Sequence, residues 1–171
     1  MSDNNGCDIL FSLLGEPIAV EQYVHSIGIK DMAIRNTEAE MHQTWDLQFK
    51  NWCTPHAMTK LLELFHTQNV LSKSSHDILW NMMAKNTTGT KRIRGHLPKG
   101  TIVADRTGTG AKDEGGVWSA VNNVGIIRLP DGNHIALSVF ITNAKADHKD
   151  VEEVIARIAR AVYDYYTPKE K

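Results

Sequence analysis

The sequence has almost no net charge, few cysteines and no long apolar run. Its 19 Lys and Arg residues nearly balance 20 Asp and Glu residues among 171 in all, which gives a formal charge of −1 at pH 7. This balance removes the electrostatic case for a nucleic-acid-binding protein or a polybasic membrane-surface protein. No run of about 18 uncharged apolar residues occurs, so we expect no membrane-spanning helix. The expected partner is therefore a small molecule.

Candidate metal ligands are also sparse. The two cysteines, Cys7 and Cys53, can form at most one disulfide, and neither lies in a Cys-x-x-Cys pair. The eight histidines are scattered, without a His-Glu-x-x-His motif or a pair at chelating helical spacing. We expect no metal ion and no other cofactor. The first ten residues also lack the basic start and apolar run of a signal peptide.

What the chain does have is the composition of a globular domain, with 42% hydrophobic and 23% charged residues. Helical periodicity, caps and glycine stops predict helices over about residues 3–14, 17–28, 54–69 and 72–85. A polar, Trp-containing loop of about residues 30–53 separates the second and third helices. Loops this long are usually functional or disordered.

The second half of the chain predicts a sheet. Residues 101–109, 117–129 and 134–142 indicate three antiparallel strands, and Pro130-Asp131-Gly132 closes the last two as a hairpin. Residues 147–166 predict a long helix that packs on the sheet. Its expected apolar stripe is Val151, Val154, Ile155, Ile158, Ala161, Val162 and Tyr165. The fold class is therefore α+β, with a mainly helical part in residues 1–86 and a sheet with its helix in residues 87–171.

Three short motifs contain reactive side chains. Ser2-Asp3-Asn4 by itself is an ordinary helix N-cap. Glu38 and His42, four residues apart in the long loop, are by themselves a solvated acidic segment. The run from Arg106 to Gly110 ends a predicted strand, where a cation, two hydroxyls and close backbone approach at Gly108 suit a carboxylate.

Together and in this order, the motifs resemble those of class A β-lactamases and their penicillin-binding relatives. Ser2-Asp3-Asn4 matches Ser-Asp-Asn, residues 38–42 match the omega-loop Glu-x-x-x-Asn with His for Asn, and Arg106-Thr107-Gly108 matches Lys-Thr-Gly with Arg for Lys. Residues 97–100, 124–127 and 129–132 are similar to the family around its sheet. The resemblance covers essentially the whole chain. The omega-loop histidine and the run NNGCDILF are most similar to a branch that includes extended-spectrum enzymes.

The departures from the family are as informative as the matches. No Ser-x-x-Lys, the family's nucleophile segment, precedes Ser2, so we expect a C-terminal portion of the fold that lacks the nucleophile helix, the first helix and two outer strands. The Arg and Asp that commonly tether the omega loop correspond to Asn36 and Asn51, which predicts no ion-pair tether and a different loop conformation. Ala39 stands where proline is common, which excludes a cis X-Pro bond there.

The resemblance assigns roles to four residues of the first half. Ser2 would protonate the leaving nitrogen, and Asn4 would bind the side-chain amide of the substrate. Glu38 would be the general base that activates the deacylating water, and His42 would help to hold that water. Asp3 would have a capping role.

It assigns the substrate carboxylate to the predicted strand. Arg106 would supply a fixed positive charge, Thr107 and Thr109 would donate hydroxyl hydrogen bonds, and the Thr109 N–H would form half of the oxyanion hole. Arg92 matches the place where some members have a carboxylate-binding arginine, since the other usual place holds Val124. An exposed loop cation is the alternative for Arg92.

The function implied by the resemblance is hydrolysis of β-lactams by a monomeric periplasmic or secreted enzyme, with this chain alone inactive. One alternative is a D-alanyl-D-alanine peptidase or another penicillin-binding protein, which generally lacks the loop glutamate. A second alternative is an inert fragment or a binding remnant.

Overall fold

The computed structural model describes residues 3–67 and 70–167. These residues form two compact units, and the boundary between them falls at Leu61 and Leu62, within helix α4 (Pro55–Thr67). The units are called N-terminal (residues 1–61) and C-terminal (residues 62–171) below. The predicted division of the family domain near residue 86 remains a prediction.

The N-terminal unit begins with the predicted helical pair, α1 (Asn4–Leu14) and α2 (Glu16–Ser26). Asp3 caps α1, because its Oδ1 accepts a hydrogen bond from the Gly6 N–H at 3.0 Å. Gly15, with φ of 91°, ends α1 in the left-handed conformation that glycine adopts at little cost. The first helix, its cap and its stop are therefore confirmed.

The long loop of the N-terminal unit contains short regular elements. Strands β1 (Met32–Ala33) and β2 (Trp52–Cys53) pair antiparallel and bring the two ends of the loop together. Between them lie helix α3 (Glu38–Met41) and the 3-10 helix η1 (Trp45–Lys50). The β1–β2 pair thus closes the loop that contains Glu38 and His42.

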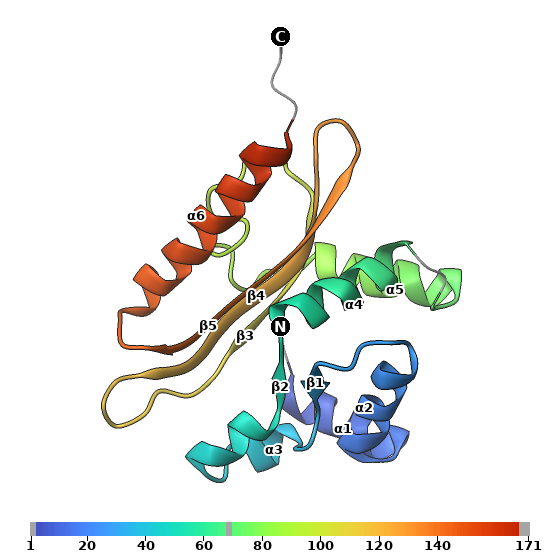
Figure 1. Cartoon of the computed structure of the whole chain (residues 1–171), viewed down its shortest axis with the longest axis vertical. Helices are drawn as coiled ribbons and strands as arrows, with labels where there is room; N and C mark the ends of the chain where they lie inside the picture. Colours follow the sequence, from blue (N-terminus) through green and yellow to red (C-terminus); the bar gives the residue numbers. More distant parts are fainter. Residues whose placement is uncertain (1–2, 68–69, 168–171) are drawn as a thin grey trace. The chain divides into compact units, whose positions relative to one another are not determined.

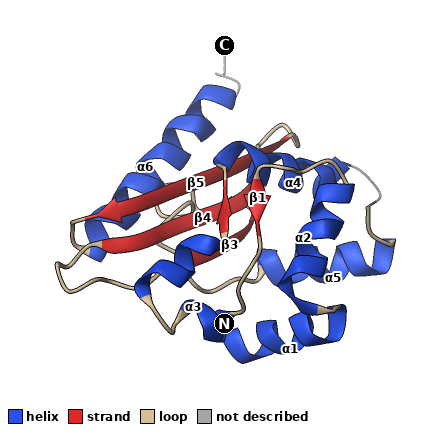
Figure 2. Ribbon diagram, turned by 60° about the horizontal axis from the view of Figure 1, so that its bottom comes forward, coloured by secondary structure: helices blue, strands red, loops and turns tan. Residues whose placement is uncertain are grey.

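The C-terminal unit is built on an antiparallel sheet in the order β3-β4-β5 (Figures 1 and 2). The strands are β3 (Val103–Thr109), β4 (Trp118–Arg128) and β5 (His134–Ala144). The pair Arg128↔His134 closes the predicted hairpin. Helix α6 (His148–Tyr166) covers one face of the sheet, and α5 (Lys73–Ala84) lies with the second half of α4 on the other (Figure 1). The predicted strands, their order and the C-terminal helix are confirmed.

The predicted apolar stripe of α6 is wrong in part. The buried residues are Val151, Ile155, Ala156, Ala159 and Tyr163. Three members of the predicted stripe are exposed, namely Val154 at 48%, Ile158 at 39% and Tyr165 at 80%. The helix is apolar on more than one side, so a period of 3.6 residues does not identify the side that meets the sheet. Two of the buried residues, Ala156 and Ala159, are small, and the predicted stripe did not include them.

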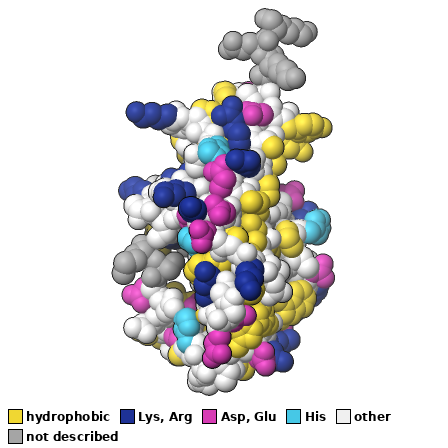
Figure 3. Space-filling model, turned by 90° about the vertical axis from the view of Figure 1, so that its left-hand side faces the viewer, with side chains coloured by type: hydrophobic (Ala, Val, Ile, Leu, Met, Phe, Trp, Pro, Cys, Tyr) yellow, Lys and Arg dark blue, Asp and Glu magenta, His cyan; other side chains and the backbone are white. Residues whose placement is uncertain are grey.

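The outer face of α6 is charged and balanced. Arg157 pairs with Glu153 and Arg160 with Asp164, each one helical turn apart, at 2.7 and 2.8 Å. Figure 3 shows basic and acidic side chains interleaved over this part of the surface. Neither positive nor negative charge accumulates on this face, which agrees with the net charge of the chain, −1. None of the helices in the described ranges combines the length and the apolarity that a membrane crossing requires.

A group of aromatic rings joins α4, α5 and β5 within the C-terminal unit. The ring centroids of His66 and His134 are 4.3 Å apart, and those of His66 and Trp80 are 5.7 Å apart. The His66 Nδ1 atom is buried without a hydrogen-bond partner. Burial lowers the pKa of His66, and the neighbouring His134 and His76 lower it further. Burial also lowers the pKa of His134, with a smaller contribution from Arg128.

These two histidines predict that the protein is less stable in mild acid. Their folded pKa values lie below the unfolded value of about 6.5, so the unfolded chain binds more protons as the pH falls. The contribution of the two histidines to the free energy of unfolding is therefore complete at pH values above the unfolded pKa, and it decreases as the pH falls below that pKa. His66→Phe keeps a ring in place and should flatten the dependence of unfolding free energy on pH between 7.5 and 5, as measured by urea denaturation. His56→Gln, at an exposed position, is the control, and an equal slope in His66→Phe and the parent would refute the assignment.

Candidate active site

The candidate site residues of the C-terminal unit follow a buried polar cluster on β3. Asp105 is fully buried and accepts hydrogen bonds from Arg94 Nε at 2.7 Å and Asn123 Nδ2 at 3.0 Å. Asn123 Nδ2 also donates to the Arg106 carbonyl at 2.8 Å. Gly125 on β4 faces this cluster, where a Cβ would lie 2.7 Å from the Asp105 Cβ. The cluster therefore fixes the register of β3 immediately before Arg106.

Arg106 places a positive charge on β3. The residue is half-buried on β3, opposite Val124 of β4. Its guanidinium makes no hydrogen bond or ion pair with any residue in the described ranges, unlike the neighbouring Arg94. A planar guanidinium with free N–H groups is well suited to binding a carboxylate. This geometry is consistent with the role that the resemblance assigns to Arg106.

The two threonines of the motif have different hydrogen-bond states. Thr88 Oγ1 donates to Asn86 Oδ1 at 2.8 Å and lies 3.0 Å from Thr107 Oγ1. A hydroxyl has one hydrogen, so Thr107 must donate to Thr88 and has to turn before it can bind a carboxylate. Thr109 Oγ1 instead accepts from Arg92 at 2.6 Å, which leaves its own hydrogen available.

The N–H of Thr109 points outward from β3, which is an edge strand of the three-stranded sheet. The Gly110 N–H donates to the Ala120 carbonyl at 2.9 Å, so the alternation of an antiparallel pair turns the Thr109 N–H away from β4. Gly108, opposite Asn122, leaves this edge without a side chain. An N–H free to bind a developing oxyanion is the requirement of the predicted role.

Arg92 is neither an exposed loop cation nor a free carboxylate ligand. The residue is 3% exposed. Its Nε donates to Glu152 at 3.2 Å, and Nη1 donates to the carbonyls of Gly108 and Asn122 at 3.1 and 2.8 Å. Its Nη2 contacts Thr109 and also lies 3.2 Å from His148 Nε2. The loop-cation alternative is therefore wrong. Arg92 joins β3, β4 and α6, and it contacts the end of β3 through the Gly108 carbonyl and the Thr109 hydroxyl.

The N-terminal unit brings together three other predicted site residues. Asn4 Nδ2 and His42 Nε2 are 3.4 Å apart although 38 positions separate them in the sequence. Glu38 is the first residue of α3, and Asp8 of α1 accepts hydrogen bonds from the Glu38 and Ala39 N–H groups at 2.7 and 3.0 Å. Ser2 lies outside the described residues. No peptide bond in the described ranges is cis.

The Glu38 carboxyl is a stronger base than an exposed glutamate. Burial raises its pKa, the negative charge of Asp8 raises it further, and His42 opposes the increase. A carboxylate whose conjugate acid has a raised pKa accepts a proton more readily than an exposed glutamate does. The electrostatic environment therefore fits the predicted general base.

Amide hydrogen bonds tether the long loop in place of an ion pair. Asn51 Oδ1 accepts from the N–H groups of Arg35 and Asn36 at 2.7 and 2.9 Å, and Asn51 Nδ2 donates to the Asn36 carbonyl at 2.8 Å. Asn36 Nδ2 in turn donates to the Leu47 carbonyl at 2.8 Å. Asn36 and Asn51 are uncharged and join the two ends of the loop by these hydrogen bonds. The loop nevertheless has a tether, which the sequence analysis did not foresee.

Asn51→Ala should release this tether. It removes three hydrogen bonds with the backbone, each worth about 0.5–1.5 kcal/mol in a typical protein, and one with Met41 Sδ. We therefore expect a loss of about 2 kcal/mol in local stability. Hydrogen exchange at the Arg35 and Asn36 amides should become roughly 30-fold faster. Gln48→Ala, in the same loop but with a bond only to the Trp45 carbonyl, serves as the control. Unchanged protection at residues 35 and 36 would show that Asn51 does not hold the loop.

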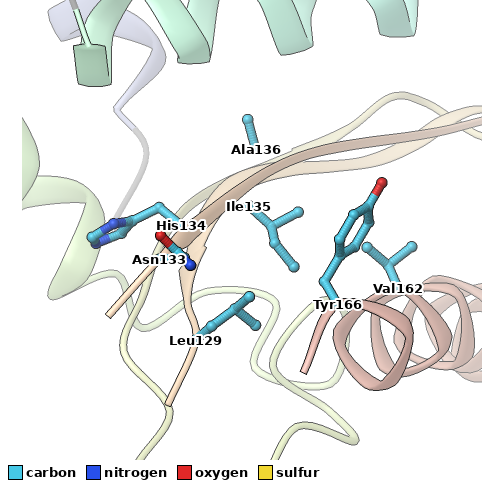
Figure 4. A pocket seen from close by; sticks show the side chains of 7 residues that line it. All are labelled: Leu129, Asn133, His134, Ile135, Ala136, Val162 and Tyr166. Carbon is cyan, nitrogen blue, oxygen red and sulfur yellow. The ribbon is translucent and has the colours of Figure 1, made fainter. Parts of the chain in front are cut away.

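A hollow of about 550 Å³ in the C-terminal unit is separate from the predicted site residues. It is lined by Leu129, Asn133, His134, Ile135, Ala136, Val162 and Tyr166. Figure 4 shows the His134 ring and the Tyr166 hydroxyl pointing apart. A ligand site usually has polar groups that converge on the ligand, and this hollow does not.

The described residues contain no group of three or more His, Cys, Asp or Glu side chains that could hold a metal ion. Both cysteines are free thiols. Burial raises the pKa of the Cys7 thiol, and it raises that of Cys53 to about 11. At neutral pH both thiols are therefore protonated and weakly nucleophilic.

The antiparallel sheet with helices on both faces, together with the arginine-threonine-glycine strand and the loop glutamate, is the arrangement expected of the β-lactamase family. Residues 1–166 match the family described as the beta-lactamase enzyme family, and the chain belongs to it. The class A resemblance is thereby confirmed.

The similarity to individual proteins extends over nearly the whole chain. The chain is 42% identical to β-lactamase VEB-1 of Pseudomonas aeruginosa over 170 residues, which are 98% of this chain and 56% of the relative. The crystal structure of TLA-1 extended-spectrum β-lactamase matches with a TM-score of 0.95 and 42% identity, over 97% of this chain and 60% of that one. A class A β-lactamase from Bacteroides cellulosilyticus DSM 14838 matches with a TM-score of 0.91 and 34% identity, over 95% and 58%. The chain thus spans little more than half the length of these proteins.

Proposed function

We propose that the whole protein hydrolyses β-lactam antibiotics through a serine acyl-enzyme. The observation that carries the proposal is the setting of Glu38, which begins α3, has a raised pKa and lies in the same unit as the Asn4 and His42 contact. Hydrolysis of an acyl-enzyme needs a general base that takes a proton from water, and Glu38 is held as such a base would be. Formation of the acyl-enzyme uses no water and does not need a base for this purpose.

The proposed reaction has two steps. A serine that the 171 residues do not supply in a Ser-x-x-Lys segment attacks the lactam carbonyl and loses its hydroxyl proton. The C–N bond breaks as Ser2 relays a proton to the nitrogen, so that no net proton is lost. Glu38 then takes a proton from water, and the resulting hydroxide attacks the ester carbonyl. The ester C–O bond breaks, Glu38 returns its proton to the serine oxygen, and the ring-opened acid is released. Arg106 and Thr109 bind the carboxylate of the substrate, while the Thr109 N–H stabilises the oxyanion.

A penicillin-binding protein is the competing function, and a chimera distinguishes the two. The part of VEB-1 outside its match to this chain, where the family places Ser-x-x-Lys, is fused ahead of residue 2. The chimera should turn over penicillin with many cycles per molecule, as measured by absorbance and intact mass. A stable one-to-one adduct without turnover would instead favour the penicillin-binding function. Replacing the nucleophilic serine of the chimera with alanine is the control.

The resemblance also supports a periplasmic or secreted location and a monomeric state for the whole protein. Its proposed partners are β-lactam molecules, with no nucleic acid and no membrane. Fractionation of cells that produce the whole protein tests the location, and light scattering tests the monomer.

A further inference from the structure

Arg92 uses all the hydrogen-bond donors that an arginine has. A guanidinium carries five N–H groups and no acceptor. Four of these groups donate to oxygen atoms, which belong to Glu152, Gly108, Asn122 and Thr109. The fifth belongs to Nη2, which lies 3.2 Å from His148 Nε2. Arg92 is 3% exposed, so a donor that lost its acceptor here would be costly.

The contact with Arg92 determines the state of the His148 ring. An arginine nitrogen cannot accept a hydrogen bond, so the His148 Nε2 atom must accept one and carries no hydrogen. The ring is then neutral, with its hydrogen on Nδ1. Glu152 supports this form, because its Oε2 lies 3.7 Å from Nδ1 while its Oε1 accepts from Arg92. The geometry therefore specifies both the charge and the tautomer of His148.

The aromatic contact of His148 is with Trp118 of β4, whose ring centroid lies 5.1 Å from that of His148. The Trp118 indole N–H donates to the Ala146 carbonyl, just before α6, at 3.2 Å. The Lys112 ammonium lies 4.9 Å from the centre of the Trp118 ring. These contacts hold the start of α6 on the sheet and give the His148 ring a fixed place beside Arg92.

Charged groups of both signs surround His148. They are Arg92, Glu152, the helix-start residues Asp147 and Lys149, and, beyond the Trp118 ring, Lys112. Asp147 and Lys149 are exposed, lie 3.9 Å apart and offset each other. The balance at the ring is therefore between Glu152, which favours a positive charge on His148, and Arg92, which opposes it.

Protonation of His148 reverses its contact with Arg92. Histidine is the side chain whose charge ordinarily changes between pH 5 and 8. The protonated ring carries a hydrogen on both nitrogens, so Nε2 becomes a donor that faces another donor. The same Nη2 atom also donates to Thr109 Oγ1 at 2.6 Å. A displacement of the guanidinium therefore changes the hydrogen bond that directs the Thr109 hydroxyl.

We propose that neutral His148 is a positioning residue that holds Arg92 against Thr109 and makes carboxylate binding at this edge weaker in mild acid. The effect on substrate rests on the proposed function, because it takes Thr109 as a ligand of the substrate carboxylate. The tautomer of His148 and its coupling to Thr109 do not depend on the reaction.

Nitrogen-15 NMR of the histidine rings in the full 171-residue chain tests the contact itself. Long-range proton–nitrogen spectra at pH 8 distinguish a ring nitrogen that carries a hydrogen from one that does not. His148 should have a bare Nε2 and a hydrogen on Nδ1. His96 is the control in the same spectrum, because its Nε2 lies 2.8 Å from a Glu153 carboxylate oxygen and must carry a hydrogen. A hydrogen on Nε2 of His148 would overturn the proposal.

The same chain shows whether the ring acts on Thr109. As the pH falls from 8 to 5, the amide signal of Thr109 should move with the same midpoint as the signals of the His148 ring. In His148→Gln, whose amide oxygen accepts from Arg92 without titrating, the Thr109 signal should stay in place. His96→Gln should behave like the parent. An equal pH dependence of Thr109 in His148→Gln and the parent would refute the coupling.

The chimera with VEB-1 connects this coupling to catalysis. Relative to His148→Gln, the parent chimera should show a KM for penicillin that rises about fivefold between pH 7.5 and 5.5, as expected for the loss of one hydrogen bond. His148→Phe keeps a ring against Trp118 but has no acceptor, so its KM should be raised at both pH values without a matching change in kcat. His148→Gln should match the parent at pH 7.5. A parent-like KM in His148→Phe at pH 7.5 would show that His148 does not act on carboxylate binding.

The two proposals fail separately. If the histidine and Thr109 spectra agree with the prediction while the parent chimera does not hydrolyse penicillin, the proposed function fails and the positioning of Arg92 by His148 stands. If the chimera hydrolyses penicillin and His148 Nε2 carries a hydrogen, the positioning fails and the proposed function stands.

Discussion

Glu38→Gln in the chimera with VEB-1 should convert a turning-over enzyme into one that accumulates its acyl-enzyme. Glutamine has nearly the shape of glutamate but cannot take a proton from water, and general-base catalysis contributes about 10²–10⁴ in rate. The backbone bonds to Asp8 involve N–H groups that the substitution retains. We expect intact-mass spectra after mixing with penicillin to show a persistent species heavier by one substrate molecule.

Glu40→Gln is the matched control for this prediction. Glu40 lies two residues further on in α3, is exposed, and accepts hydrogen bonds from the Thr37 N–H and hydroxyl. Glutamine preserves such a capping box, so turnover should be close to that of the parent. Unchanged turnover without an adduct in Glu38→Gln would show that another group activates the water.

Asp105→Ala should destabilise the C-terminal unit more than any other single change considered above. It removes one partner of an ion pair whose carboxylate is fully buried, and it removes the acceptor of Arg94 Nε and one of the two acceptors of Asn123 Nδ2. Breaking a buried pair in this way typically costs about 3–5 kcal/mol. The midpoint of urea denaturation should fall accordingly, with the dependence on urea concentration unchanged.

Two further substitutions identify the cause of that loss. Asp105→Asn retains an acceptor for one partner and should have a smaller effect. Asp164→Ala breaks the ion pair with Arg160, in which both side chains are about half exposed, and should change stability little because solvent screens the pair. Equal losses for Asp105→Ala and Asp164→Ala would mean that burial does not determine the contribution of the Asp105 pair.

Local sequence signals predicted most of the elements because the physical causes are local. Asp3 and Gly15 act within one turn of the helix that they begin and end. The alternation of apolar residues and the Pro130-Asp131-Gly132 turn similarly specify the β4–β5 hairpin. The side of α6 that is buried depends instead on the sheet, which is distant in sequence, and there the large apolar residues Val154 and Ile158 were misleading.

The candidate site was predictable in its residue types and not in its contacts. Motifs identified Glu38, Arg106 and Thr109, but nothing in the sequence indicated that Arg92 binds Glu152, 60 positions away. Asp8 was missed although it lies four residues after Asn4, on the same face of α1. Asp8 binds two backbone N–H groups of α3. Nearly every residue has a backbone N–H, so the sequence does not show which of them bind a distant side chain.

The central claim is that these 171 residues contain the proposed deacylating base and carboxylate-binding edge of a class A β-lactamase, without its Ser-x-x-Lys nucleophile. The most direct measurement incubates the purified chain with a chromogenic cephalosporin and follows absorbance and intact mass together. We predict hydrolysis at the rate of buffer alone and no covalent adduct. Measurable turnover by the chain would contradict the claim, most clearly if Glu38→Gln abolished it.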